Sequence, residues 1–334
     1  MSVTSRLDGF QRRHRWIGFP VAVVYKYADD QGGYLAALIT YYAFLSIFPL
    51  LLLASSGLGL VLQGNDELRL RILNSALSQF PVIGEQLAEP RGLQGSGVAL
   101  VVAVAGSVYG ALGAAQALQN AMNVAWAVPR NRRPSPLTSR LRSVMLLATA
   151  GIAVLATTLL SAVNAASGSD GPLDAGLRLV VVLGSVVVNA VVFTLLFRFS
   201  TARPLAIRDT APGGVTAAVL WQLLQSVGAV YVGSVVRHAS ATNGVFAIVL
   251  GLIAWLYVAA TVLVLCAQID VVRVKRLWPR ALLTPFTDDV DLTAGDRDTY
   301  TDAATAQRTK SFESVDVSFD NDGQNATARR EPPG

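Results

Sequence analysis

Hydrophobic residues gather in six long blocks that carry almost no charge, separated by polar connections rich in arginine. The first block, residues 35–62, runs for 28 residues without an Asp, Glu, Lys or Arg. About 20 apolar residues suffice for a helix to cross a bilayer, whereas a soluble helix normally keeps a charged face toward water. The pattern predicts an all-α, polytopic membrane protein with six transmembrane helices, near residues 35–62, 98–124, 143–166, 177–198, 212–235 and 244–269.

The charges in the connections predict how these helices are oriented. Seventeen lysines and arginines lie before the first block and in residues 127–142, 198–211 and 270–284, against five in the alternate connections. The positive-inside rule places the more basic connections in the cytoplasm. We therefore expect a multi-pass protein of the bacterial inner membrane with both termini in the cytoplasm, which six spans allow.

The segments outside the six-helix domain (residues 35–280) have their own composition. Residues 1–34 are basic and predict an interfacial helix on the cytoplasmic surface, anchored by Trp16, Phe19, Tyr25 and Tyr27. The polar residues 63–96 predict a second amphipathic helix outside the bilayer. Residues 285–334 hold 11 acidic and five basic residues and few large apolar ones, so we expect a disordered, acidic cytoplasmic tail.

Composition excludes several classes of function. The chain is 52% hydrophobic and 15% charged, whereas soluble domains are about a quarter charged. A single cysteine, Cys266, excludes an internal disulfide, and His14 and His238 lie too far apart to indicate a metal site. No Walker A, GxSxG or HExxH motif is present, so we expect no enzyme, no cofactor and no metal.

The arginines of the membrane domain report topology, so nucleic acid is not expected as a partner. The expected partner is the lipid bilayer, with anionic lipid at its cytoplasmic face. The sequence leaves the oligomeric state open.

The first block contains a polar face beside a proline. Tyr42, Ser46 and Pro49 stand at helical spacing on one side, and Pro49 removes the hydrogen bond to the carbonyl of Leu45. The Ser46 hydroxyl and the Tyr42 phenol are expected to help satisfy that carbonyl. The face predicts either a packing kink against neighbouring helices or a kink that lines a substrate path.

The second block has the densest polar face. Tyr109, Gln116, Asn120 and Asn123 cluster within roughly 60° on a helix of 100° per residue. Amides in a membrane helix face a partner helix or a wet cavity, so both structural contacts and a cavity wall remain open. A row of small residues suited to close helix contact lies beside this face: Gly106, Gly110 and Ala114.

Further candidate polar residues lie in the last three blocks. Asn189 falls near the middle of the fourth block and is expected to have a partner. Gln222 and Gln225 lie in the fifth block, and Gln268 ends the sixth. Asp270 follows among arginines and a lysine, where an ion pair is expected.

Five motifs in order resemble the YihY/BrkB family of bacterial inner-membrane proteins. They are LAALITYYAFLSIFPLLL, ALQNAMNVAW, LLFRFSTARP, PGGVTAAVLWQLLQ and TNGVFAIVLGLIAWLYVAATVLVLCAQIDVVRVKRLWPR, within residues 10–284. The resemblance implies six membrane helices with both termini inside, and no settled activity. Members have been called virulence factors, proposed transporters and ribonuclease BN, the last regarded as a mistaken label that two isolated histidines cannot support.

Two positions depart from the family pattern. Asn243 stands before Gly244 where the family commonly has tyrosine, and Gln268 stands where an acidic residue is common. If that carboxylate matters to the family, this chain works differently at Gln268.

Two hypotheses of function follow. The first is a transporter or translocator of an amphipathic, lipid-like substrate through a polar-lined cavity. The alternative is a membrane scaffold that recruits partners through its cytoplasmic surface and acidic tail.

Overall fold

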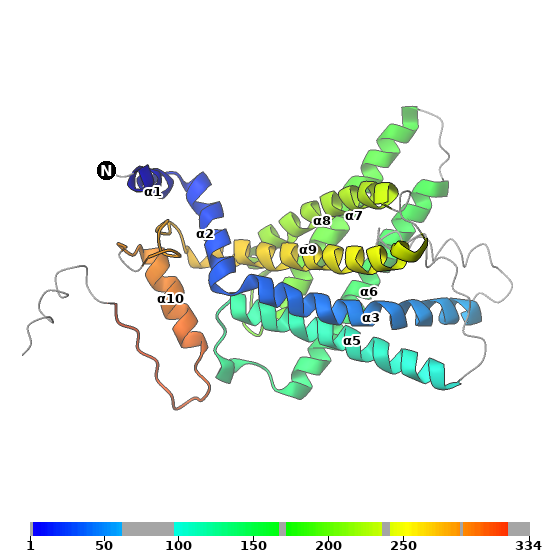
Figure 1. Ribbon diagram of the computed structural model, residues 1–334, viewed down its shortest axis with the longest axis horizontal. Coiled ribbons are helices and arrows are strands. Elements are labelled where there is room, and N and C mark those ends of the chain that lie inside the picture. Colours follow the sequence, from blue (N-terminus) through cyan, green and yellow to red (C-terminus); the bar gives the residue numbers. More distant parts are fainter. Residues whose placement is uncertain (1–2, 62–96, 167–171, 236–240, 288–289, 320–334) are drawn as a thin grey trace, which may run out of the picture.

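A computed structural model describes residues 3–61, 97–166, 172–235, 241–287 and 290–319 (Figure 1). Within these residues the regular elements are helices without any strand, which confirms the predicted all-α class. Each of the six apolar blocks coincides with one long helix. These helices are α3 (Gly32–Val61), α5 (Gly97–Ala125), α6 (Pro136–Ala166), α7 (Pro172–Ser200), α8 (Ile207–Val235) and α9 (Ala241–Lys275).

The helices extend beyond the apolar blocks into the polar connections. Helix α6 begins seven residues before its block, at Pro136, a residue favoured at the first position of a helix. Helix α9 continues through Arg273 to Lys275, because basic residues favour the negative C-terminal end of a helix. Among the described residues, Val182–Ser200 and Val249–Lys275 are long and apolar enough to cross a membrane, and Gly32–Ile47 is a shorter apolar helix. That all six helices cross stays a prediction.

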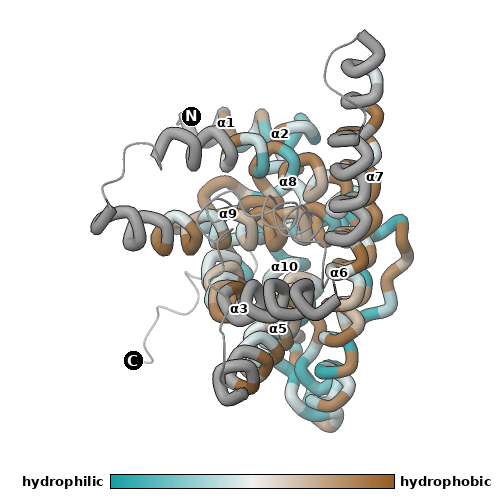
Figure 2. The backbone as a smooth tube through the Cα atoms, turned by 90° about the vertical axis from the view of Figure 1, so that its right-hand side faces the viewer, coloured by the Kyte–Doolittle hydropathy of each residue, from teal (hydrophilic) through white to brown (hydrophobic). Residues whose placement is uncertain are grey.

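The six long helices form a closed ring. Each packs against the next along the chain, and α9 packs back against α3. Helix α5 also contacts α7 and α9 across the ring. Figure 2 shows hydrophobic residues along these helices, whereas hydrophilic residues gather in the connecting segments.

One end of the ring carries the remaining described helices, and we call it the α10 end. Helices α1 (Val3–Arg13), α2 (Arg15–Asp29) and α10 (Ala294–Ala306) lie there (Figure 1), and the short η1 (Arg130–Arg132) connects α5 to α6 at the same end. Helices α5 and α9 end in turns where Ala127 and Arg276 adopt positive φ angles of 50° and 55°. In both turns the next amide donates five residues back, which satisfies a terminal carbonyl.

The prediction of a disordered tail over residues 285–334 is wrong for residues 294–306, which form α10. Thr293 and Asp296 build a capping box at its start, each side chain bonding the other residue's backbone. Asp296 and Thr299 are buried against the segment that follows α9. The composition indicated disorder because it does not reveal these distant polar partners. The helix expected within residues 63–96 lies outside the described residues.

Helix α2 lies where the interfacial helix was expected, but most of its expected anchors contact protein. Trp16 is 72% exposed. Phe19 packs edge-on against Trp278, and the Tyr25 hydroxyl donates to the carbonyl of Leu282 at 2.7 Å. Tyr27 packs over Gly32. Helix α2 is therefore a docked part of the α10 end.

Candidate functional site

A buried charged cluster joins α2 to α9 at the α10 end of the ring. Lys26 and Asp30 form an ion pair one helical turn apart, and both side chains are buried. The Gln268 amide donates from Nε2 to Oδ2 of Asp30 at 2.8 Å. Gln268 Oε1 is buried without a hydrogen-bond partner among the described residues. The cluster therefore holds one carboxylate between two donors.

Burial sets the electrostatics of this cluster. Desolvation raises the pKa of Asp30 above its ordinary value, although the Lys26 ammonium and the Gln268 amide act in the opposite direction. A buried ion pair of this kind contributes little net stability but is costly to break, because one charge is then left unpaired. The Gln268 amide suits the site because it donates to Asp30 and adds no second negative charge.

A second buried network centres on Arg280 and holds α10 in place. The Arg280 guanidinium contacts three groups: Asp296 through Nε, Thr299 Oγ1 through Nη1 at 3.3 Å, and Asp29 through Nη2 at 3.0 Å. Burial lowers the pKa of Arg280, but its two carboxylate partners outweigh that effect and raise it overall. Arg280 also lies over the Tyr300 ring, whose centroid is 5.7 Å away. The network ties α10 to α2, which lie far apart in the sequence.

Asp270 does not form the ion pair predicted for it. Its Oδ1 accepts the backbone amide of Gly213 at 2.7 Å, and its Oδ2 has no hydrogen-bond partner among the described residues. Pro212 cannot donate to the carbonyl of Arg208, which instead accepts from the Arg273 guanidinium. A Cβ on Gly213 would lie 2.5 Å from the carbonyl oxygen of Cys266. The PGG motif thus lets α8 approach α9 closely.

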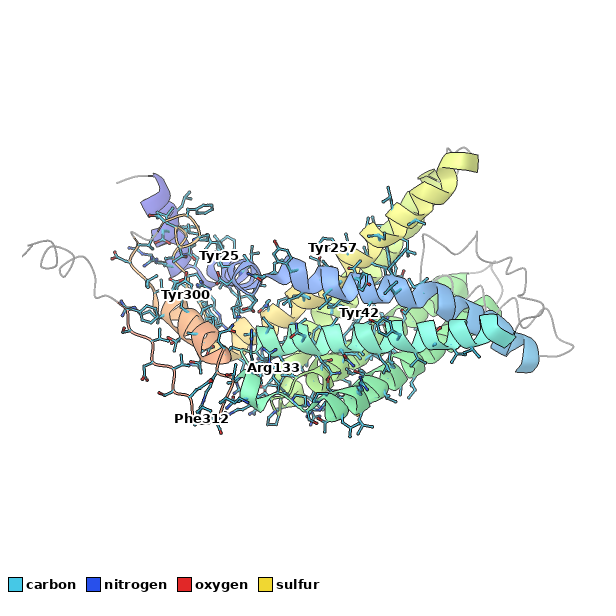
Figure 3. The ribbon with its side chains drawn as sticks, turned by 60° about the horizontal axis from the view of Figure 1, so that its bottom comes forward. Tyr25, Tyr42, Arg133, Tyr257, Tyr300 and Phe312 are labelled. Carbon is cyan, nitrogen blue, oxygen red and sulfur yellow. The ribbon has the colours of Figure 1, made fainter. Side chains whose placement is uncertain are left out.

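The polar face of the first block packs against α5. A Cβ on Gly110 would lie 2.7 Å from the backbone nitrogen of Ser46, and a Cβ on Gly113 would overlap the Tyr42 ring. Tyr42 lies between α3 and α5 (Figure 3). Its ring meets that of Tyr109 with centroids 6.1 Å apart. These contacts favour packing over a substrate path at this position.

One detail of the first-block prediction is wrong. The Ser46 hydroxyl donates to the carbonyl of Ala43 at 2.8 Å, not to that of Leu45, because the hydroxyl reaches back along its own helix. Pro49 lies within α3, but its side chain is outside the described set. Gly106 and Ala114 are half-buried on α5 beside Gly110.

The amide face of α5 divides among separate partners. Asn120 Oδ1 accepts from Arg133 at 3.1 Å, and Asn123 Oδ1 accepts the Ala202 amide at 2.8 Å. Gln116 is exposed. Gln119, which the sequence analysis missed, donates to the Ser143 hydroxyl at 2.8 Å and so ties α5 to α6. At Asn120 and Asn123 the structure thus shows contacts between segments.

The remaining candidates lie beside an aromatic layer. Trp221 of α8 meets Phe193 of α7 at 6.1 Å and Trp255 of α9 at 5.4 Å, measured between ring centroids. Asn189 precedes Phe193 by one helical turn, and Gln225 follows Trp221 by one turn. Because α7 runs toward the α10 end and α8 runs away from it, both amides lie one turn beyond the aromatic layer. Gln222 is half-buried next to Trp221.

Sequence signals existed for some of the residues that were missed. Lys26 in an otherwise apolar stretch, followed four residues later by Asp30, is the spacing of a helical ion pair. Arg280 gave no local signal, because its partners lie up to 251 residues away. No group of three or more His, Cys, Asp or Glu side chains able to hold a metal occurs in the part of the chain that the structure describes.

Comparison with known proteins decides the family. The family model described as Virulence factor BrkB matches residues 23–284, well over half of the chain. The chain belongs to the BrkB family. This BrkB-family chain is therefore a membrane protein, as the sequence motifs implied, and α10 lies beyond the matched range.

A curated relative agrees with this assignment. The BrkB-family chain is 25% identical over 259 residues to a UPF0761 membrane protein of Halorhodospira halophila (strain DSM 244 / SL1). The alignment covers 75% of this chain and 56% of the relative, so the chain spans about half the length of that protein. No solved structure matches.

Gln268→Glu, which places a second carboxyl group beside Asp30, is expected to destabilise this chain at neutral pH. Asp30 loses a donor and gains a second negative charge, which costs roughly 1–3 kcal/mol and raises the pKa of Asp30 further. A carboxyl group with a raised folded-state pKa stabilises most at low pH, so the deficit should shrink as pH falls from 8 to 5. Thermal unfolding across that range measures it. Gln307→Glu, on an exposed side chain at the end of α10, is the control, and a deficit independent of pH would contradict the account.

Proposed function

We propose that this BrkB-family protein is a multi-pass translocator of the inner membrane that moves an amphipathic, lipid-like substrate through its helix ring. In this proposal all six long helices cross the bilayer, and the α10 end faces the cytoplasm. The observation that carries the proposal is the aromatic layer, which closes the ring on its α10 side and leaves amide side chains one turn beyond it.

The closure at the α10 side is apolar and tightly packed. Met122, Phe197 and Cys266 are buried in one cluster that α5, α7, α8 and α9 build together. Phe193 belongs to this cluster and contacts Trp221 at its edge. A polar headgroup cannot pass such a layer without displacing it, since uncompensated burial of polar groups costs several kcal/mol. The ring is therefore in a state closed toward α10.

The amides beyond the layer suit a headgroup. Asn189 and Gln225 come from adjacent helices and reach the same level of the ring, and each side chain both donates and accepts hydrogen bonds. Neither brings a charge. Polar groups at this depth fit a substrate with a neutral or zwitterionic polar part and an apolar remainder.

The scaffold hypothesis receives less support from the contacts of α10. Asp296 pairs with Arg280 and Asp302 pairs with Lys275 at 2.7 Å. These acidic side chains are therefore engaged within the chain and not available to recruit a basic partner.

The test is translocation of a headgroup-labelled fluorescent phospholipid in proteoliposomes. Asn189→Leu combined with Gln225→Leu is expected to slow translocation about tenfold, equivalent to roughly 1.4 kcal/mol of hydrogen bonding. Gln116→Leu, which removes an exposed amide from α5, should leave the rate unchanged. A double variant that folds normally and translocates at the wild-type rate would rule out this path.

A further inference from the structure

Two connecting segments and the start of α6 meet at the C-terminal end of α5. Asn123 Oδ1 holds the backbone amide of Ala202 at 2.8 Å, and Arg142 Nη1 of α6 donates to the carbonyl of Thr201 at 3.5 Å. The Arg203 guanidinium lies 5.9 Å from the ring centroid of Trp126. The α5–α6 turn, the start of α6 and the α7–α8 connection are thus joined at one place. We call Arg133, Arg142 and Arg203 the basic corner.

Arg133 is partly buried and is held by neutral acceptors. Its Nε donates to the carbonyl of Val128 at 3.2 Å, and its Nη1 donates to Asn120 Oδ1 at 3.1 Å. Burial, together with the charge of Arg130, lowers the pKa of Arg133. Figure 3 shows this residue at the end of α5. The guanidinium is therefore fixed in position without a negative partner.

The other two arginines also have no acidic partner among the described residues. Within the described residues, the ion pairs of the α10 end join other groups, and none involves Arg133, Arg142 or Arg203. Asp302 reaches this region but is paired with Lys275, whose Nζ also donates to the carbonyl of Trp126 at 3.0 Å. The terminal carbonyls of α5 offset part of the charge. A net positive charge remains at the corner.

An exposed apolar stripe begins beside the basic corner. Leu137, Leu141 and Val144 stand at helical spacing on α6 and are 70%, 65% and 56% exposed. In a membrane protein such a stripe faces acyl chains. Its first residue follows Arg133 by four positions, so the corner lies at the level where acyl chains end and headgroups begin.

We propose that the basic corner binds the phosphate headgroup of one anionic phospholipid, whose acyl chains lie along the Leu137–Leu141–Val144 stripe of α6. Guanidinium groups bind phosphate oxygens through charge-assisted hydrogen bonds. Arg133 and Arg142 are held by neutral acceptors, and Arg203 is exposed beside Trp126, so all three keep donors that can turn to one ligand. The bound lipid would join the α5–α6 turn to the α7–α8 connection. This inference does not depend on substrate translocation.

Native mass spectrometry tests the inference on the full chain, reconstituted in nanodiscs of mixed phosphatidylcholine and phosphatidylglycerol. The wild-type protein should retain phosphatidylglycerol in preference to phosphatidylcholine. Arg203→Gln should lower that preference about fivefold, and Arg142→Gln with Arg203→Gln about 25-fold, since each basic residue near a membrane surface contributes about fivefold. Arg203→Lys, which keeps the charge on an exposed side chain, should retain most of the preference.

Arg208→Gln is the matched control, because this exposed arginine pairs with Asp209 outside the basic corner. If Arg208→Gln and Arg203→Gln lose the preference for phosphatidylglycerol equally, the preference comes from the general positive potential of the surface. That result would overturn the proposed site. Unchanged preference in the double variant would overturn it as well. Displacement of the retained lipid by inorganic phosphate would assign the corner to a soluble anion instead.

Discussion

Replacing Arg280 with alanine is expected to release α10 and to destabilise the α10 end by about 3–5 kcal/mol, the cost of leaving buried charges unpaired. Arg280 is 1% exposed, and Asp296, its partner through Nε, is fully buried. The substitution also removes the donor to Asp29 and the contact with the Tyr300 ring. Limited proteolysis should then cut within residues 294–306, and the melting temperature should fall.

A charge-free replacement separates the loss of packing from the loss of charge balance. Arg280→Met combined with Asp296→Asn keeps an acceptor for the capping box, leaves fewer unpaired charges and should recover part of the stability lost in Arg280→Ala. Arg208→Ala, on an exposed side chain, should change the melting temperature little. Resistance of α10 to protease in Arg280→Ala would show that the network does not hold this helix.

Gly110→Leu is the second substitution with a large expected effect, because it separates α3 from α5. The new Cβ would lie 2.7 Å from the Ser46 nitrogen and 2.8 Å from its Cα, so the backbone of α3 must move. Overpacking of this kind costs about 1–3 kcal/mol and more where backbone must shift. We expect a lower melting temperature in detergent and a weaker contact between Tyr42 and Tyr109, visible in tyrosine cross-linking.

The chain offers a matched control for this substitution. Gly151 lies on α6 with no atom within 4 Å of an added Cβ. Gly151→Leu therefore adds the same side chain to a helix of the same ring without a clash. Equal melting temperatures for Gly110→Leu and Gly151→Leu would contradict the close α3–α5 contact.

The six long helices could be predicted from the sequence because hydrocarbon imposes a simple rule. A block of about 20 uncharged residues satisfies its backbone only as a helix in a membrane, so each block marks one helix. The first and last residues of the helices were less predictable. Helix α6 begins at Pro136 and α9 ends at Lys275 because polar residues outside the apolar block continue the helix.

The candidate site was harder to predict, because helical periodicity shows which side chains share a face of a helix but not which residues they contact. Gly110 was predicted for close helix contact, and an added Cβ there would lie 2.8 Å from the Ser46 Cα. Asn120 and Asn123 were correctly placed on one face of α5, yet one holds Arg133 and the other holds Ala202. Both partners lie in connections whose folding the helical periodicity does not encode. The same reason explains why the contacts of Arg280 with α2 and α10 were missed.

The most direct test of the account is the accessibility of single cysteines in a Cys266→Ala background, labelled with a membrane-impermeant thiol reagent in intact cells. Ser135→Cys, before α6, and Phe312→Cys, an exposed residue after α10 (Figure 3), should react only after the membrane is permeabilised. Gly176→Cys, exposed near the start of α7, should react from outside. Labelling of Ser135→Cys in intact cells, or of Ser135→Cys and Gly176→Cys from the same side, would contradict a six-helix ring that crosses the membrane with its α10 end in the cytoplasm.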